Sequence, residues 1–198
     1  MKYIALVVIM AMSSNFLLFG QKDKEPIKIE IKDGEKKVDV MVAGELFTSY
    51  IYPDNVMKPV LWPVISPDGN MLTRSYPMIN KAGDRTDHPH HVGIWLNYGY
   101  GSIFHQSIEK TKSGKGKALL VTKSIWKAPD NTSMLEEKTS FSFKAGKDIR
   151  IIDRTTELTA LIDEVKFTDN KEGMFAIRVA REMELPSEKP TTLMDSHG

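Results

Sequence analysis

The stretch that decides the fold is IKIEIKDGEKKVDVMV, residues 27–42, in which apolar and polar side chains alternate twice in succession. Isoleucine takes every second position at the start of the stretch, and valine does the same at its end. The Asp33-Gly34 pair between the two segments has the residue chemistry of a turn. Because successive side chains of a strand point to opposite faces, the pattern predicts two strands that each bury one face.

The rest of the chain continues with short β-rich runs separated by turn residues. We predict strands at 46–52, 60–65, 92–98, 119–126, 134–143, 149–162 and 175–183. We predict turns at 66–70, 129–131 and 145–148, which are rich in proline, glycine, aspartate and asparagine. The run from Lys112 to Lys117, with two glycines among its lysines, predicts a flexible solvated loop.

These elements predict an all-β fold. Apolar residues spaced by three and four do not persist over any long window, so the sequence favours few or no helices after its first segment. Strands joined by short turns favour an antiparallel β-sandwich over a parallel doubly wound sheet. No break in composition divides residues 21–198, which we expect to form a single domain.

The first twenty residues differ in character from the rest. A short positive start, Met1-Lys2, precedes a largely apolar run to Gly20, and the chain then turns charged. This pattern is typical of a secretory signal peptide over residues 1–20. A membrane anchor is the alternative, which fits less well because the apolar core is short and interrupted by polar residues. The chain has no cysteine, so disulfides are excluded. An exported protein without disulfides fits a bacterial periplasm or cell exterior and must be stabilised by its core.

The charge and hydropathy of the chain limit the classes of partner that it is expected to bind. The chain has 27 basic and 26 acidic side chains, and loss of Lys2 with the signal segment leaves it neutral. No basic stripe with interleaved aromatic residues stands out, which argues against a nucleic-acid partner. No second apolar run reaches membrane-spanning length, so we expect no membrane association after signal cleavage. The sequence leaves the oligomeric state open.

Histidine is concentrated in one short segment. The stretch RTDHPHHVGIW, residues 85–95, holds three of the chain's five histidines beside an aspartate, an arginine and a tryptophan. If extended, the segment places His88 and His90 on one face and His91 on the other, while Pro89 restricts it to a strand entry, an edge or a loop. We interpret the cluster as a functional site. A solvated loop, or histidines that close a turn through backbone hydrogen bonds, are the alternatives.

A divalent metal ion is one hypothesis for this cluster. The spacing of His88 and His90 lets two imidazoles converge on one ion, and a zinc site needs at least a third ligand. Asp87, His91, His105 or a distant acidic residue are candidates for it, and the spacing does not choose among them. In this hypothesis the protein is a metal-dependent hydrolase or oxygenase, since iron and copper also suit imidazole.

Four runs of the sequence resemble a known family. They are KPVLWPV (58–64), TRSYP (73–77), DRTDHPHHVGIW (84–95) and KEGMFAIRVA (171–180). On these runs the chain resembles the bacterial exported family labelled PmoA, or "methane oxygenase PmoA", over residues 40–198. The resemblance implies a β-sandwich and, because members occur in bacteria rich in polysaccharide-degrading systems, a carbohydrate substrate. Members usually continue beyond the position of Gly198, which implies a chain incomplete at its C-terminus.

The methane oxygenase label conflicts with the hydropathy of the chain. The membrane methane monooxygenase subunit of similar name is built from membrane-spanning helices. This chain has one short apolar segment, at its N-terminus, followed by alternating polar and apolar residues. We therefore do not expect membrane methane monooxygenase activity.

With a carbohydrate as substrate, the candidate residues divide into catalytic and binding groups. His88 or His90 would exchange a proton, with Asp87 or Glu172 as the carboxylate partner. The binding candidates are aromatic and charged side chains suited to a small molecule or oligosaccharide, and they are Arg74, Tyr76, Arg85, His91, Trp95 and Arg178. A solvated strand face is an equally good interpretation of Glu172 and Arg178. A secreted binding module without catalysis remains a further alternative.

Overall fold

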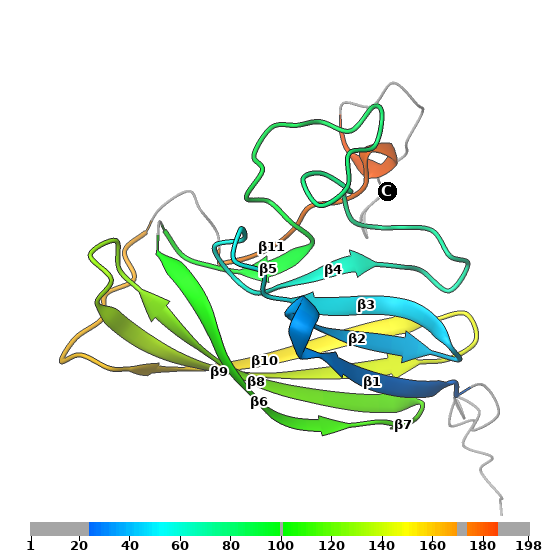
Figure 1. Ribbon diagram of the computed structural model, residues 1–198, viewed down its shortest axis with the longest axis horizontal. Helices are drawn as coiled ribbons and strands as arrows, with labels where there is room; N and C mark the ends of the chain where they lie inside the picture. Colours follow the sequence, from blue (N-terminus) through cyan, green and yellow to red (C-terminus); the bar gives the residue numbers. More distant parts are fainter. Residues whose placement is uncertain (1–23, 100, 170–173, 186–198) are drawn as a thin grey trace, which may run out of the picture.

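The computed structural model describes residues 24–99, 101–169 and 174–185, so the predicted signal segment lies outside the described residues. Within these ranges the chain is almost entirely β (Figure 1). The strands are β1 (Pro26–Lys32), β2 (Lys37–Val42), β3 (Glu45–Ile51), β4 (Val60–Val64), β5 (Ile94–Leu96), β6 (Ser102–Lys112), β7 (Gly114–Lys115), β8 (Lys117–Lys127), β9 (Ser133–Ala145), β10 (Arg150–Ala160) and β11 (Phe175–Ile177). Two 3-10 turns, η2 (Asp33–Glu35) and η3 (Arg181–Met183), accompany them. In the described part of the chain, no helix has the length and apolarity to cross a membrane.

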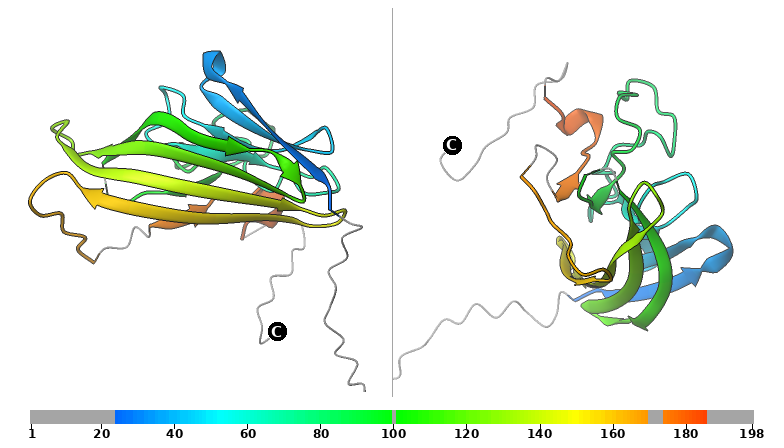
Figure 2. Two further views of the ribbon diagram at one scale, coloured as in Figure 1. Left: turned by 90° about the horizontal axis from the view of Figure 1, so that it is seen from below. Right: turned by 90° about the vertical axis from the view of Figure 1, so that its left-hand side faces the viewer.

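The strands form two antiparallel sheets that pack against each other (Figures 1 and 2). The larger sheet has the order β11-β5-β4-β3-β2-β1-β7, and the smaller has the order β10-β9-β8-β6. The opening stretch of the sequence forms β1 and β2, which pair antiparallel with Ile29 opposite Val40. The prediction of an all-β antiparallel sandwich is confirmed.

The core lies between the two sheets and follows from the alternation of side chains. The inward valines of β2, from Val38 to Val42, are at most 2% exposed and belong to one apolar cluster with residues of β8 and β9. On β9 every second residue from Leu135 to Ala145 is buried. A period of two therefore places one face of each strand inside, as expected for a half-buried sheet.

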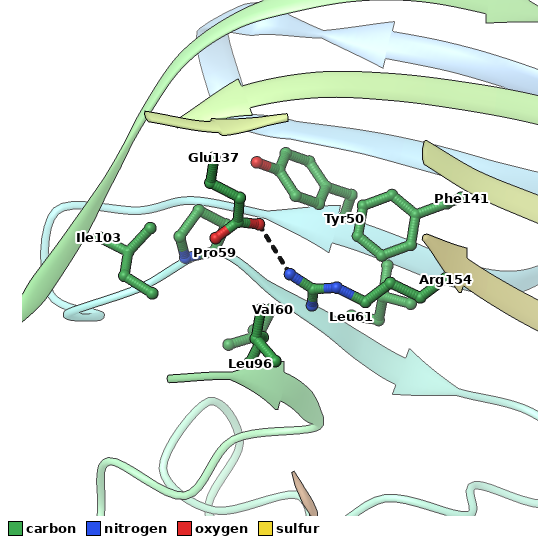
Figure 3. A pocket seen from close by; sticks show the side chains of 9 residues that line it. All are labelled: Tyr50, Pro59, Val60, Leu61, Leu96, Ile103, Glu137, Phe141 and Arg154. Carbon is green, nitrogen blue, oxygen red and sulfur yellow. Dashed lines mark hydrogen bonds and ion pairs between the residues drawn. The ribbon is translucent and has the colours of Figure 1, made fainter. Parts of the chain in front are cut away.

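Polar side chains interrupt the inner face of the smaller sheet. Glu137 on β9 forms an ion pair with Arg154 on β10 at 2.7 Å (Figure 3). The same carboxylate accepts hydrogen bonds from the indole of Trp126 and the hydroxyl of Thr139, each at 2.6 Å. The adjoining cavity measures about 10 Å³, room for about one water at most. Glu137 is therefore part of the core, whereas Arg154 also lines an open pocket of about 500 Å³.

The structure adds two features to the middle of the chain that the sequence analysis does not contain. The sequence pattern does not predict β6, which is the edge strand paired with β8. Its only buried residue is Ile103, because an edge strand exposes most of its side chains and so lacks a clear hydrophobic alternation. The predicted solvated loop from Lys112 to Lys117 is the exposed connection between these strands, and it contains the short strand β7, which pairs with β1.

The predicted strand at 175–183 is shorter in the structure. Only β11 continues the sheet, and Val179 then forms an isolated bridge with Thr73 before η3. The amide of Ala180 donates to the carbonyl of Leu72 at 2.9 Å. These bonds bring residues 174–185 alongside the long connection between β4 and β5, at the top of Figure 1. The histidine segment lies in that connection.

Candidate functional site

The histidine segment forms a turn rather than a strand. The amide of His91 donates to the carbonyl of His88 at 2.9 Å, with Pro89 at the second position of the turn, where its fixed φ is favoured. His88 itself has a φ of +45°. The three rings gather together, with centroids 4.9 Å apart for His88 and His91 and 4.4 Å apart for His90 and His91. The alternation of faces expected for an extended segment does not occur, because the chain reverses here.

One buried side chain, Arg74, holds this turn in place. It is 1% exposed, and its guanidinium donates to four backbone carbonyls at 2.9 to 3.3 Å. The carbonyls belong to Arg85, Asp87, His88 and His91. Such a set of charge-assisted bonds fixes the path of an otherwise irregular loop. Arg74 therefore lies behind the loop and positions the histidines.

The carboxylate of Asp87 lies at the centre of the polar contacts. It accepts a hydrogen bond from His88 Nδ1 at 2.6 Å and forms ion pairs with Arg74 and Arg178, each at 3.1 Å. The hydrogen bond from His88, with the positive charges of Arg178 and Arg74, lowers the pKa of Asp87. An ionised carboxylate only accepts hydrogen bonds, so Nδ1 of His88 carries a proton in this pair. Nε2 is then the ring nitrogen left to act on a ligand.

A second layer of charges supports Asp87. Arg178 Nε contacts Glu184 at 2.9 Å, and Arg85 Nε lies 3.5 Å from the same carboxylate. Glu184 is only 8% exposed, so these pairs are less screened than surface pairs. The guanidinium of Arg74 also lies over the ring of Tyr76, 5.6 Å from its centroid. The arginines thus form a linked network behind the histidine turn.

An open pocket of about 740 Å³ lies beside the histidine turn. Its described lining consists of Met57, Lys58, His88, His90, His91, Trp95, Asn97, Gly99, Gly101, Phe175 and Ala176. The volume falls in the usual range for small-molecule sites, about 300–1,000 Å³. Apolar walls with a few polar groups are also typical of such sites.

Two pocket residues pack around the indole of Trp95. The ring of His91 stacks on it at 5.0 Å between centroids, and Lys58 Nζ lies 5.2 Å from the ring centroid. Trp95 is 7% exposed, so it offers a ligand little free surface for stacking. Burial, with the charges of His90 and His88 next in effect, lowers the pKa of His91 to about 4. The imidazole of His91 is therefore neutral at neutral pH.

Lys58 is a charged pocket residue that the sequence analysis does not single out as a site candidate. It is 4% exposed, and its ammonium donates to the carbonyl of His90 at 3.0 Å. Burial lowers the pKa of Lys58 to about 8. A lysine placed directly before the apolar run Pro59 to Val64 was the available signal, because lysine is rarely buried.

The predicted site residues fall into three groups. His88, His90, His91 and Trp95 line the pocket. Asp87 contacts His88, while Arg74, Tyr76, Arg85 and Arg178 belong to the supporting network. Glu172 lies outside the described residues. A further position considered for the site, His105, lies on β6 and bonds instead to the hydroxyl of Tyr50 at 3.0 Å.

The metal hypothesis receives no third ligand from the described part of the chain. No group of three or more histidine, cysteine or acidic side chains there is arranged to hold a metal ion. The rings of His88 and His90 lie 5.8 Å apart between centroids, and a zinc site needs at least three protein ligands. Binding of a metal by His88 and His90 stays a prediction.

Comparison with known proteins gives one result. Residues 37–198 match the model of a family described as "Family of unknown function (DUF6807)". Neither the curated proteins nor the solved structures gave a significant match.

Proposed function

This chain belongs to DUF6807, a family of unknown function, and we propose that it is an exported protein that binds a carbohydrate in the histidine pocket. We further propose that the Asp87–His88 pair transfers a proton to or from the bound sugar. The observation that carries the proposal is this pair at 2.6 Å, next to a pocket of small-molecule size.

The chemistry of the pair supports proton transfer. A carboxylate that holds one ring nitrogen of a histidine fixes its tautomer and stabilises the charged imidazolium. The two arginines that contact Asp87 keep it ionised and in place. Proton transfer to or from a hydroxyl group or an activated carbon is within the reach of such a pair. The amide of Asn97, also in the pocket lining, is suited to bind sugar hydroxyls.

Sequence features outside the pocket support the export and carbohydrate parts of the proposal. The apolar segment at residues 1–20 has the pattern of a signal peptide. The resemblance of four runs to PmoA-like exported proteins suggests polysaccharide-rich surroundings. Both features remain predictions about where the protein acts and on what.

The test combines binding with turnover. Purified protein is screened against neutral and acidic mono- and oligosaccharides by calorimetry, and solvent deuterium incorporation and product masses are recorded for each. We expect Asp87→Asn and His88→Asn to lower turnover by roughly 10²–10⁴-fold while sugar binding persists. Asparagine is chosen at position 88 because it tolerates a positive φ. His105→Gln, in the other sheet, is the matched control and should behave as wild type.

Three results would count against this function. Sugar binding without any turnover would refute the proton-transfer step and indicate that the protein is a binding module without catalysis. Stoichiometric bound metal, lost in both His88→Ala and His90→Ala, would replace the proposal with a metal-dependent enzyme. Failure to bind any sugar would refute the carbohydrate assignment itself.

A further inference from the structure

We infer that Lys58 forms an anion subsite in the histidine pocket and that the ligand carries a carboxylate, as in a uronic acid. This inference rests on the proposed carbohydrate function and deepens it by naming the class of sugar. The inference begins from the position of Lys58, a buried cation at the wall of an open pocket. Lys58 is 4% exposed and yet lines the pocket of about 740 Å³.

Within residues 24–99, 101–169 and 174–185, the ammonium of Lys58 has no partner of opposite charge. Its contacts are the carbonyl of His90 at 3.0 Å and the face of Trp95 at 5.2 Å. Among the residues that the structure describes, no carboxylate lies within ion-pair distance of it. A buried charge is costly unless it is paired. A ligand carboxylate in the pocket would supply the missing partner.

Unlike Lys58, the neighbouring arginines each have a carboxylate partner. Arg74 and Arg178 are paired with Asp87, and Arg85 with Glu184. The described carboxylates of this region, Asp87 and Glu184, are therefore already engaged with arginines. Burial lowers the pKa of Lys58 to about 8, the direction expected for a cation that lacks a counter-charge. The imidazole of His91 beside it is neutral at neutral pH and does not compete for an anion.

The geometry of the ammonium leaves room for this role. A lysine ammonium has three hydrogen-bond donors, and the bond to His90 uses one of them. That bond also ties Lys58 to the histidine turn, so a ligand held by the ammonium would lie beside the imidazoles. A carboxylate on the sugar would then fix its position relative to His88.

The test compares matched sugars that differ only at C6, where one carries a carboxylate and the other a hydroxymethyl group. Calorimetry measures the binding of the methyl glycosides of glucuronic and galacturonic acid, each against its neutral parent, methyl glucoside or galactoside. We expect at least one acidic sugar to bind roughly ten- to a hundredfold more tightly than its parent, the range for a hydrogen bond to a charged group. Lys58→Gln keeps a donor for the His90 carbonyl but removes the charge, so the ratio of the acidic-sugar to the neutral-sugar affinity should fall to about one. Lys58→Arg should restore part of the preference.

Lys28→Gln is the control for net charge, because Lys28 lies on β1 with its side chain 73% exposed. It should keep the full preference for the acidic sugar. If wild type binds neutral and acidic sugars equally, or if Lys58→Gln keeps the preference, the anion subsite is refuted while the proposed function stands. If no sugar binds, both the proposed function and this inference fail. Thermal unfolding of each variant shows whether a loss reflects the site or the fold.

Discussion

At the scale of single residues, the histidine turn combines an ionised carboxylate, Asp87, with a neutral imidazole, His91. Asp87 is kept ionised by the hydrogen bond from His88 and by two arginines. His91 is kept neutral by burial against Trp95 and by its histidine neighbours. Groups of the same turn thus hold different charges because they face different surroundings, which is how perturbed pKa values mark candidate sites.

The depressed pKa of His91 predicts a pH effect on stability. Its folded-state pKa of about 4 lies below the value of about 6.5 in unfolded chains. The unfolded state therefore binds a proton first, and stability falls as the pH drops from about 6.5 towards 4. The variant His91→Phe keeps an aromatic ring against Trp95 but has no group that binds a proton in this pH range. We expect the free energy of unfolding of wild type relative to this variant to fall by on the order of 1 kcal/mol between pH 7 and 5, allowing for the partial exposure of the ring.

Urea unfolding at both pH values measures this difference. The comparison with His91→Phe cancels the contributions of other groups that titrate in the same range, including His105, whose pKa burial also lowers. Parallel pH profiles for the two proteins would show that His91 protonates equally in both states.

At the scale of elements, the histidine turn is joined to β5 through a position that accepts only glycine. Gly93 has a φ of +57°, and a Cβ atom there would lie 2.0 Å from the carbonyl oxygen of Leu61 on β4. The carbonyl of Gly93 accepts a hydrogen bond from the amide of Arg178 at 2.9 Å. β4, β5 and the segment after β11 therefore meet at one residue, two positions after His91.

Gly93→Ala should be strongly destabilising. The added methyl group cannot avoid a backbone atom of the neighbouring strand, so we expect a loss above about 3 kcal/mol in unfolding free energy, or failure to fold. Gly44→Ala is the matched control: Gly44 has a φ of +92° but open space around its Cβ position. It should cost only about 1–2 kcal/mol, from backbone strain alone. Equal losses for the two variants, measured by urea unfolding, would contradict the close approach.

At the scale of the whole molecule, a polar layer divides the core of the sandwich. One apolar cluster contains Phe141 and Phe143, and another contains Trp126 and Leu135. Glu137 lies between them on the same inner face of β9, paired with Arg154 across the strands. The carboxylate has three partners, including Trp126 and Thr139, so this layer is well satisfied despite its burial. Such networks are costly when broken and near neutral when replaced whole.

The charge of Glu137 predicts strong coupling with Arg154. Glu137→Gln leaves a buried guanidinium without its counter-charge and should lower the unfolding free energy by about 3–5 kcal/mol. Arg154→Met in the same background should recover part of that loss, so the double variant is more stable than the sum of the single changes predicts. The exposed pair of Lys144 and Asp153 is the control, and Asp153→Asn should change stability by less than about 1 kcal/mol. Additive losses in the double-mutant cycle would argue against the pair.

The sequence was most predictive where one side of a strand is buried. The alternation at 27–42 correctly predicted β1, β2 and the turn between them. The predicted strands at 119–126, 134–143 and 149–162 match β8, β9 and β10 to within about two residues at each end. β6 escaped prediction because an edge strand with one buried residue carries no periodic signal. The histidine cluster was found from composition alone, whereas its shape was not, because Pro89 permits a turn as readily as a strand entry.

The sequence by itself determined the class of fold and the segment that carries the candidate site, since both are written in local patterns of residue type. Only the tertiary structure decided what each charge does. Arg74 and Arg178 are separated from the histidines in sequence but enclose Asp87 in space, and Lys58 reaches the same pocket from before β4. Contacts between distant segments depend on strand order and on how two sheets pack, and neither is encoded in the periodicity of any one segment.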